Sequence, residues 1–378
     1  MSAVVSLQTK KTFLCVLCVS AVKTSFESVT DKPFFMKIDI KGMDLEETRQ
    51  WVGTIGLESY RAAQIRQWIF KGLAVSFQEM TNLSKAARHN LEQEAQLQVL
   101  EEAEVQVSRD GTRKHLFRLH DGSFIEAVLI PERDHFTLCI SSQSGCSMGC
   151  RFCLTGKQGF KRNLTPSEIA DQVIQVRRSM EDPDRLTNLV LMGMGEPLAN
   201  YAAVIKAIRN IVDLEGMNFS NRKVTLSTCG LVPEILRFGN DVTVNLAVSL
   251  NAADNETRDF LMPINHAYPL ETLMAACREF PLPHGRRITF EYILIKGVND
   301  RDEDAIRLAK LLTGIKAKVN LIPLNPHQGL DMSPPTEERM VAFQEILIQH
   351  RFTVMIRKSK GRDISAACGQ LAGKRAEG

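Results

Sequence analysis

Short apolar, β-branched segments alternate with amphipathic segments from Thr137 onward, and this alternation limits the fold more than any other feature. The expected strands span residues 137–141, 188–192, 223–227, 244–249, 288–295 and 318–323, with 352–357 as a candidate last strand. The expected helices span 166–180, 201–214, 232–238, 270–280, 302–312 and 335–350. This pattern predicts parallel strands joined by helical crossovers. Six such units are fewer than the eight of a closed barrel, so we expect an α/β fold with an open, partial (β/α)6 barrel.

The chain before the barrel divides into two further segments. Residues 36–100 place apolar side chains at helical spacing, which predicts a small helical accessory domain. Residues 101–132 hold the turn signals Asp110-Gly111 and Asp121-Gly122 between β-type segments, which predict a β-hairpin linker. We therefore expect the barrel at 133–357 and a separate C-terminal segment at 358–378.

The composition is that of a globular protein with a mildly basic charge. The chain has 378 residues, 44% of them hydrophobic and 24% charged, and a net charge of +3. This charge is compatible with an RNA partner but does not require one. Nine cysteines without a regular framework argue against a secreted disulfide scaffold. We therefore expect a cytoplasmic protein.

Residues 1–35 form a doubtful N-terminal extension. Lys10 and Lys11 precede the apolar run 13–22, which resembles the start of a signal peptide and is too short to span a bilayer as a helix. We favour a non-native extension with Met36 as the natural start, and an organelle transit peptide is another alternative. No other stretch is long and apolar enough to be transmembrane, so no membrane partner is expected.

The run Cys146-Ser-Met-Gly-Cys150-Arg-Phe-Cys153 is the most specific motif of the chain. Three thiolates at C-x3-C-x2-C spacing can hold three irons of a 4Fe–4S cluster and leave the fourth iron open, unlike the paired C-x2-C motifs of a closed zinc site. With Phe152 before the last cysteine, the run resembles the signature of radical S-adenosylmethionine (SAM) enzymes. That resemblance implies that the open iron binds the amino and carboxylate groups of SAM. A zinc knuckle or three unrelated thiols are the alternatives.

Glycine and polar residues follow the expected strands, where the carboxyl ends of parallel strands form one ligand-binding rim. Gly195 would let a ligand approach the backbone, and Glu196 can accept hydrogen bonds from its ammonium group. Hydroxyl and amide side chains suit a carboxylate or ribose, and Asn325 suits an adenine edge. Each residue alone is also explained as a turn or helix cap. The expected cofactor-binding residues are Gly195, Glu196, Ser227, Ser249, Leu250, Asn251 and Asn325.

Three residues outside these motifs are candidate catalytic groups. Cys139 and Cys368 are each explained as small buried hydrophobic residues, but together they could act as a nucleophile and a resolving thiol. Glu126 interrupts an apolar strand. It could be a base with a raised pKa or a member of a cross-strand ion pair.

Taken together, the motifs are similar to those of the RlmN/Cfr class of RNA adenine methyltransferases. The similarity spans about residues 37–373, and Cys368 within Ala367-Cys-Gly-Gln370 separates this class from other radical SAM enzymes. Residues 262–265 and 268–270 and the helical N-terminal segment resemble the RlmN branch. Ser144 and Cys229 depart from the family pattern at positions that carry no catalytic role. The motifs that carry the resemblance are 139–146, 150–153, 159–164, 193–197, 246–250, 288–292, 319–323 and 367–370.

The resemblance implies a reaction in two halves that consumes two SAM molecules. Cys368 would first take a methyl group from one SAM. A second SAM would be cleaved at the cluster, and its radical would remove a hydrogen atom from the methylated thiol. The carbon radical would add to C2 of an adenine, Glu126 would remove the C2 proton, and Cys139 would release the product by forming a disulfide with Cys368. The implied substrates are 23S ribosomal RNA and tRNA.

The same resemblance implies that the helical accessory domain binds RNA and that flavodoxin with flavodoxin reductase donates electrons; we expect a monomer. A Cfr-like enzyme that methylates adenine C8 is the nearest alternative. A radical SAM enzyme acting on a protein or metabolite, and an RNA-binding protein with a structural zinc, are alternatives from other classes.

Four basic clusters are candidate RNA contacts, although each is also explained as a solvated face. The cluster that flanks Cys368 is the one we favour. The four are Lys157, Lys161 and Arg162; Arg177 and Arg178; Arg286 and Arg287; and Arg357, Lys358, Lys360 and Arg362.

Overall fold

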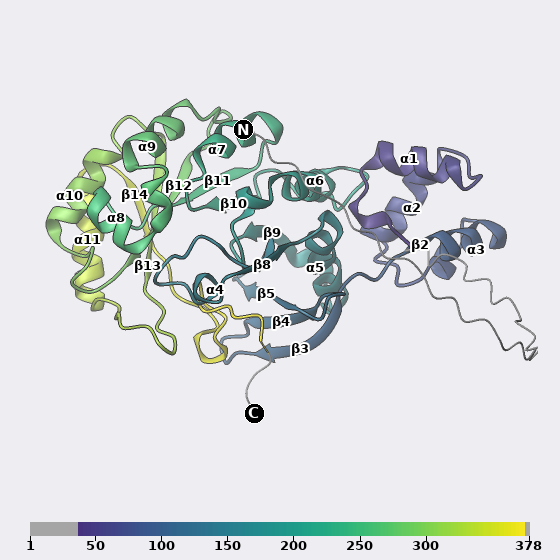
Figure 1. Cartoon of the computed structure of the whole chain (residues 1–378), viewed down its shortest axis with the longest axis horizontal. Helices are drawn as coiled ribbons and strands as arrows, with labels where there is room; N and C mark the ends of the chain where they lie inside the picture. Colours follow the sequence, from purple (N-terminus) through teal and green to yellow (C-terminus); the bar gives the residue numbers. More distant parts are fainter. Residues whose placement is uncertain (1–36, 375–378) are drawn as a thin grey trace, which may run out of the picture. The chain divides into compact units, whose positions relative to one another are not determined.

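The computed structural model describes residues 37–374, so the doubtful extension at 1–35 lies outside the described residues. A ten-stranded sheet with the order β14-β13-β12-β11-β10-β9-β6-β5-β4-β3 forms the centre of the fold (Figure 1). Seven of its strands are parallel, and they match the strands expected from sequence. These are β6 (Phe136–Cys139), β9 (Leu186–Leu191), β10 (Val224–Thr228), β11 (Asn245–Ser249), β12 (Ile288–Leu294), β13 (Ala317–Pro323) and β14 (Thr353–Ile356).

Helices join the parallel strands in the expected alternation, which confirms a partial α/β barrel. A short helix that the sequence pattern did not predict, α8 (Asn255–Leu261), begins at Asp254, whose side chain accepts a hydrogen bond from the Thr257 backbone N–H. Seven residues are too few to show clear helical periodicity. The other crossover helices are α5 (Pro166–Arg178), α6 (Tyr201–Val212), α7 (Val232–Asp241), α9 (Leu270–Glu279), α10 (Asp302–Leu311) and α11 (Glu337–Gln349).

Three antiparallel strands extend the barrel sheet on one side. They are β3 (Glu101–Val107), β4 (Arg113–Arg118) and β5 (Phe124–Pro131), and β5 pairs with the first barrel strand, β6. The two turns of this segment lie where the sequence predicts them. The strands are continuous with the barrel sheet, whereas the sequence pattern predicted a hairpin that links two domains.

The N-terminal helices are α1 (Leu45–Thr54), α2 (Arg61–Phe70) and α3 (Lys85–Glu94). Asp44 and Glu47 form a reciprocal capping box at the start of α1, and Ser84 caps α3. Short parallel strands, β1 (Ile38–Asp39) and β2 (Ala95–Gln96), pair at the two ends of this helical segment. No described helix is long and apolar enough to cross a membrane.

Buried polar contacts attach the N-terminal helical segment to the barrel. Lys41 pairs with Asp171 of α5, and both side chains are fully buried. The second oxygen of Asp171 accepts hydrogen bonds from the backbone N–H groups of Val99 and Leu100, at 3.2 and 2.9 Å. One carboxylate thus compensates a buried ammonium and also holds the chain where it leaves the helical segment.

Substitution of Asp171 by Ala should destabilise the protein strongly. The change leaves the Lys41 ammonium buried without a counter-charge, for which we expect a loss of about 3–5 kcal/mol in the free energy of unfolding. Chemical denaturation measures this loss. Glu46→Ala is the matched control, because the Glu46–Arg49 pair is exposed and contributes less than about 1 kcal/mol. Equal stability of the two variants would contradict the assignment.

Candidate active site

One cavity of about 170 Å³ lies at the carboxyl ends of strands β9 to β13. Its walls come from these strand ends, from the cysteine loop and from the C-terminal segment. Most of the residues singled out from sequence therefore meet in one place. The predicted site residues that line it are Cys139, Cys146, Cys150, Cys153, Gly195, Glu196, Ser227, Ser249, Asn251 and Cys368.

A two-stranded stem closes the loop that carries the cysteine triplet. Strands β7 (Gln143–Gly145) and β8 (Phe160–Asn163) pair in antiparallel fashion, and the Cys146 N–H donates to the Gly159 carbonyl at 3.1 Å. Gly145 has a φ of 76°, and a Cβ atom there would lie 1.9 Å from the Gly159 oxygen. The stem thus requires glycine at this position, and it returns the chain close to its starting point on the other side of the triplet.

The three thiols suit a cluster that is held on one side by protein. Burial raises the pKa of Cys146 to about 11. Burial also raises the pKa of Cys150, and negative charge on Cys153 and Cys146 adds to this shift. A bound cationic iron centre reverses such shifts and stabilises the thiolates. Within the described residues no three His, Cys, Asp or Glu side chains form a ready-made site for a single metal ion. Three cysteine thiols in one glycine-rich loop are the donor set that suits a 4Fe–4S cluster with three protein ligands.

Gly195 and Glu196 lie in the loop that follows β9, and they contact neighbouring loops of the site. Gly195 has a φ of 98°, and a Cβ atom there would lie 2.5 Å from the Gln143 Cβ, so only glycine fits. The Glu196 carboxylate accepts hydrogen bonds from the backbone N–H groups of Cys229 at 2.8 Å and Leu198 at 3.1 Å. Burial raises the pKa of Glu196 despite these bonds. Glu196 therefore shapes the cavity wall as well as facing into it.

Hydroxyl and amide groups line the next two strand ends. The Ser227 and Ser249 hydroxyl oxygens lie 3.4 Å apart. Asn251 has a left-handed backbone with a φ of 60°, and its Oδ1 accepts from the Ile293 N–H at 2.9 Å. Leu250, which was predicted to bind the cofactor, is fully buried in the hydrophobic core and is not among the residues that line the cavity.

The C-terminal strap, residues 366–373, carries Cys368 into the cavity beside α4 (Leu154–Lys157) (Figure 1). The Gly369 carbonyl accepts from the Leu154 N–H at 2.8 Å, and the Leu371 carbonyl accepts from the Thr155 hydroxyl at 2.7 Å. Asn325 Nδ2 donates to the Cys368 carbonyl at 3.1 Å, and its Oδ1 is buried without a partner. Asn325 thus binds the backbone of the strap and does not line the cavity.

Cys139 and Cys368 face the same cavity as free thiols. Cys139 is buried at the end of β6, whereas Cys368 is exposed to the cavity. Burial raises the pKa of Cys139, and negative charge on Cys368 adds to this shift. The protein around Cys368 raises the pKa of that thiol to about 11. The disulfide implied by the family resemblance is not formed in this structure.

Glu126 has two sets of partners in the structure, and the first is the cross-strand ion pair that was one of the two interpretations of its sequence position. Its Oε1 lies 3.3 Å from Lys114 Nζ, which is the cross-strand ion pair. Its Oε2 accepts hydrogen bonds from the backbone N–H groups of Ala372 and Gly373, at 2.7 and 3.1 Å. Glu126 does not line the cavity directly and instead anchors the end of the C-terminal strap.

Glu291 lines the cavity but was not singled out from sequence beyond its place in a family motif. It lies in β12, in register with Ser249 of β11 and Asn320 of β13. Its position among apolar strand residues, like that of Glu126, is a signal that could have marked it as a candidate.

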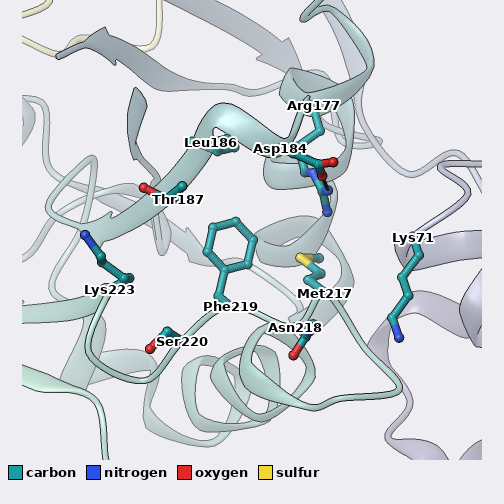
Figure 2. A pocket seen from close by; sticks show the side chains of 10 residues that line it. All are labelled: Lys71, Arg177, Asp184, Leu186, Thr187, Met217, Asn218, Phe219, Ser220 and Lys223. Atoms are coloured by element: carbon teal, nitrogen blue, oxygen red, sulfur yellow. Dashed lines mark hydrogen bonds and ion pairs between the residues drawn. The ribbon is translucent and has the colours of Figure 1, made fainter. Parts of the chain in front are cut away.

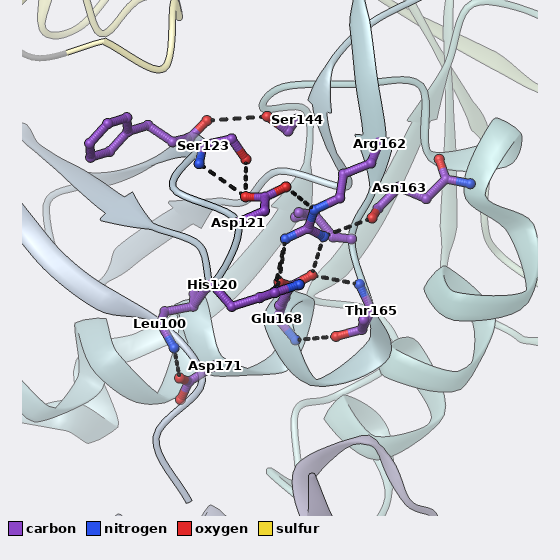
Figure 3. Close-up of polar contacts among 12 residues, drawn as sticks. Leu100, His120, Asp121, Ser123, Ser144, Arg162, Asn163, Thr165, Glu168 and Asp171 are labelled. Atoms are coloured by element: carbon purple, nitrogen blue, oxygen red, sulfur yellow. Dashed lines mark hydrogen bonds and ion pairs between the residues drawn. The ribbon is translucent and has the colours of Figure 1, made fainter. Parts of the chain in front are cut away.

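Most of the basic residues predicted to contact RNA instead hold parts of the protein together. Arg162 donates to both oxygens of Glu168, at 2.7 and 2.8 Å, and to Asp121 at 2.7 Å (Figure 3). Arg178 donates to the carbonyl oxygens of Leu73 and Ala74 in the helical segment. The Arg162 guanidinium thus joins β8, α5 and the β4–β5 turn, and its contact with RNA stays a prediction. Other predicted contacts with protein partners are Lys157, Arg177, Arg286 and Arg287.

The basic cluster beside Cys368 is different. Arg357, Lys358 and Arg362 are exposed, and Lys360 is half-buried. Among the residues that the structure describes, these four side chains form no hydrogen bond or ion pair with another group. Their charge therefore remains available next to the strap.

A second, larger cavity of about 540 Å³ lies at the other ends of the strands (Figure 2). Leu186, the first residue of β9, and Lys223, which precedes β10, line it together with Phe219 and Met217. None of the predicted catalytic or cofactor-binding residues lies there. Its size therefore does not make it the active site.

The fold and the cysteine loop define the chain as a radical SAM enzyme. The family model described as the radical SAM superfamily matches residues 140–309. The model of the ribosomal RNA large subunit methyltransferase N-terminal domain matches residues 38–97. A crystal structure of a radical SAM methyltransferase from Sphaerobacter thermophilus is similar to the chain with a TM-score of 0.86 and 44% identity, and the match covers 89% of this chain and 100% of that one.

The curated relatives narrow the family. The dual-specificity RNA methyltransferase RlmN of Desulfosudis oleivorans is 54% identical over 335 residues, which is 88% of this chain and 90% of that protein. The protein of the same name from Geobacter sulfurreducens is 52% identical, over 89% of this chain and 92% of that protein. The chain belongs to the RlmN family of radical SAM methyltransferases.

Replacement of Arg162 by Ala should act mainly on the free energy of unfolding of the protein and have a smaller effect on its affinity for RNA. The Glu168 side chain is only 1% exposed and would lose its charge partner, for which we expect a loss of about 2–4 kcal/mol in the free energy of unfolding. Lys161→Ala is the matched control, because Lys161 is exposed on the same strand. Chemical denaturation compares the two variants. If Arg162→Ala is as stable as wild type and its binding of RNA depends less on salt, Arg162 contacts RNA and does not mainly stabilise the fold.

Proposed function

We propose that the chain methylates C2 of adenosine in 23S ribosomal RNA and in tRNA, with Cys368 as the methyl carrier. The observation that supports this most directly is the path of the C-terminal strap, which brings Cys368 into one cavity with Cys139 and the cysteine triplet. Radical SAM enzymes that act without a protein methyl carrier have no need for such a strap. The relatives named RlmN support RNA as the substrate class.

In this proposal the cysteine loop binds the iron–sulfur cluster, and residues at the strand ends bind SAM. Cys146, Cys150 and Cys153 would hold a 4Fe–4S cluster, and when bound this cluster supplies the electron that cleaves SAM. Glu196 lines the cavity and would accept hydrogen bonds from the ammonium group of SAM. The hydroxyls of Ser227 and Ser249 suit its ribose or carboxylate.

The two free thiols would share the transfer of the methyl group. Cys368 forms a bond to the methyl carbon of one SAM, the sulfonium–carbon bond breaks, and the thiol proton leaves. After the carbon has been joined to adenine C2 and the C2 proton has left, the Cys139 thiolate attacks the Cys368 sulfur. A disulfide forms, the carbon–sulfur bond breaks, and the carbon keeps the electron pair and takes up a proton to become the methyl group. Cys139 and Cys368 line one cavity, as this exchange requires.

Glu126 would remove the proton from adenine C2 before the product is released. In this structure one of its oxygens is occupied by the N–H groups of Ala372 and Gly373. Release of the last residues of the strap would free this oxygen, while Lys114 stays paired with the other. Glu126 therefore serves as an anchor for the strap when no adenine is bound.

The RNA would have to present its adenine outside the base stack, as enzymes that modify bases require. The basic cluster of Arg357, Lys358, Lys360 and Arg362 lies next to Cys368 in the chain and would contact the phosphates on either side of that base. A reducing, cytoplasmic setting suits the free thiols, and flavodoxin with flavodoxin reductase is the electron donor that the family resemblance favours. A monomer is sufficient, because all proposed catalytic residues lie in one chain.

Cys368→Ala should abolish RNA methylation by protein reconstituted anaerobically with iron and sulfide. The assay supplies methyl-labelled SAM, a reductant, unmodified ribosomal RNA and tRNA, and the RNA is digested for mass spectrometry of nucleosides. Wild-type protein should place label in 2-methyladenosine, and Cys368→Ala should place none because the methyl carrier is missing. Cys277→Ala is the matched control, since this buried cysteine lies outside the cavity.

Other outcomes of this assay separate the alternatives. Label in 8-methyladenosine would move the protein to the Cfr-like reaction. Retained turnover in Cys368→Ala would exclude the proposed mechanism and favour a radical SAM enzyme with a different substrate.

Binding of tRNA should depend less on salt when single residues of the basic cluster beside Cys368 are replaced by alanine. Lys358→Ala and Arg362→Ala should each lower the slope of log K against log salt by about 0.7–0.9, because each removes one phosphate contact. Lys223→Ala is the matched control, because Lys223 is exposed at the second cavity and at the other end of the strands. Titrations at several salt concentrations measure the slopes. Equal slopes in all proteins would exclude this cluster as the RNA contact.

A further inference from the structure

One carboxyl group in the active-site cavity has no role in the proposed chemistry. Glu291 of β12 lines the cavity together with Cys139 and Cys368. Ser249 and Asn320 are its partners in register on the two neighbouring strands. Residues paired in this way project to the same face of a sheet. The Glu291 side chain therefore belongs to a polar row on the inner wall of the barrel.

The protein uses only part of the hydrogen-bonding capacity of Glu291. Asn320 Nδ2 donates one long hydrogen bond, of 3.4 Å, to Oε1. In the described part of the chain the carboxylate accepts no other hydrogen bond and forms no ion pair, so Oε2 is free to bind a ligand. Burial raises the pKa of Glu291, and the positive charges of Arg357 and Lys318 oppose this shift without cancelling it. Burial therefore shifts the equilibrium toward the neutral acid relative to an exposed carboxyl group, and the neutral acid both donates and accepts hydrogen bonds.

The Watson–Crick edge of adenine is complementary to a neutral carboxyl group. Adenine N1 accepts a hydrogen bond and the N6 amino group donates one, so the acid can form two parallel bonds with this edge. C2 of adenine is bonded directly to N1. An adenine held in this way carries C2 beside the carboxyl group, in the cavity that Glu291 shares with Cys139 and Cys368.

We propose that Glu291 binds the Watson–Crick edge of the target adenine and thereby selects adenine over guanine. This inference rests on the proposed function, because it takes adenine C2 as the methyl acceptor. Guanine presents an N1–H donor and an O6 acceptor along this edge and carries an amino group on C2. The carboxyl group therefore holds the base and orients its reacting carbon, whereas proton removal from C2 remains with Glu126.

Two substitutions distinguish binding of the base from proton transfer. Glu291→Gln keeps one donor and one acceptor in the same place but cannot take up a proton, whereas Glu291→Ala removes both groups. The assay is RNA methylation by reconstituted protein, with kcat and KM measured on tRNA that carries either adenosine or purine riboside at the target position. Purine riboside lacks the N6 amino group. Mass spectrometry of the Cys368 peptide after incubation with SAM alone reports the first half of the reaction separately.

On adenosine, Glu291→Ala should lose about 10- to 100-fold in kcat/KM, the size expected for a bidentate contact to a base, and Glu291→Gln should keep most of the wild-type value. Wild-type protein should lose about tenfold on purine riboside, since one of the two bonds is missing. Glu291→Ala should treat the two substrates alike. Methylation of Cys368 should proceed in all three proteins.

Two results would overturn the inference. If Glu291→Gln is as inactive on RNA as Glu291→Ala while Cys368 is still methylated, the carboxyl group transfers a proton and does not read the base. If Glu291→Ala still distinguishes adenosine from purine riboside as wild type does, Glu291 does not contact this edge. Absence of Cys368 methylation in wild-type protein would instead contradict the proposed function itself.

Discussion

The active site depends on the hydrogen bonds that hold the C-terminal strap across the carboxyl ends of the parallel strands. Leu154, Thr155 and Asn325 bind its backbone from one side, and the Glu126 carboxylate binds its far end. Without these bonds, Cys368 would lie on an unanchored terminus, far from the triplet in sequence and in space. Ordering a terminus costs conformational entropy, which these backbone contacts offset.

A second constraint is that two buried carboxylates of helix α5 have positively charged partners. Asp171 is paired with Lys41, which lies 130 positions earlier in the chain, and Glu168 is paired with Arg162 of the neighbouring strand β8. The first attaches the N-terminal segment to α5, and the second fixes the stem of the cysteine loop to the same helix (Figure 3). Helix α5 thus positions both the helical segment and the cluster loop.

The sequence predicts what depends on local periodicity and misses what depends on pairing over long distances. The helix expected at 201–214 is found at Tyr201–Val212, because its apolar spacing is local information. The cysteine loop was predictable for the same reason, because the spacing of its three cysteines is local and itself indicates the kind of site they form. The contact of Glu126 with Gly373 joins residues 247 positions apart, so no local pattern reveals it. The carboxylate partners of Arg162 were likewise not predictable, because composition alone does not show which arginines form ion pairs.

Several acidic groups line the cavity, and the protein alone does not stabilise their negatively charged forms. Burial raises the pKa values of Cys139, Cys146, Glu196 and Glu291, and charge repulsion between neighbours adds to several of these shifts. Such a site favours cationic ligands, because each bound positive charge relieves this repulsion. An iron–sulfur centre at the thiols and the sulfonium and ammonium groups of SAM supply such charges. The same burial raises the pKa of Glu291 and so favours the hydrogen-bond donation that we propose for recognition of the base.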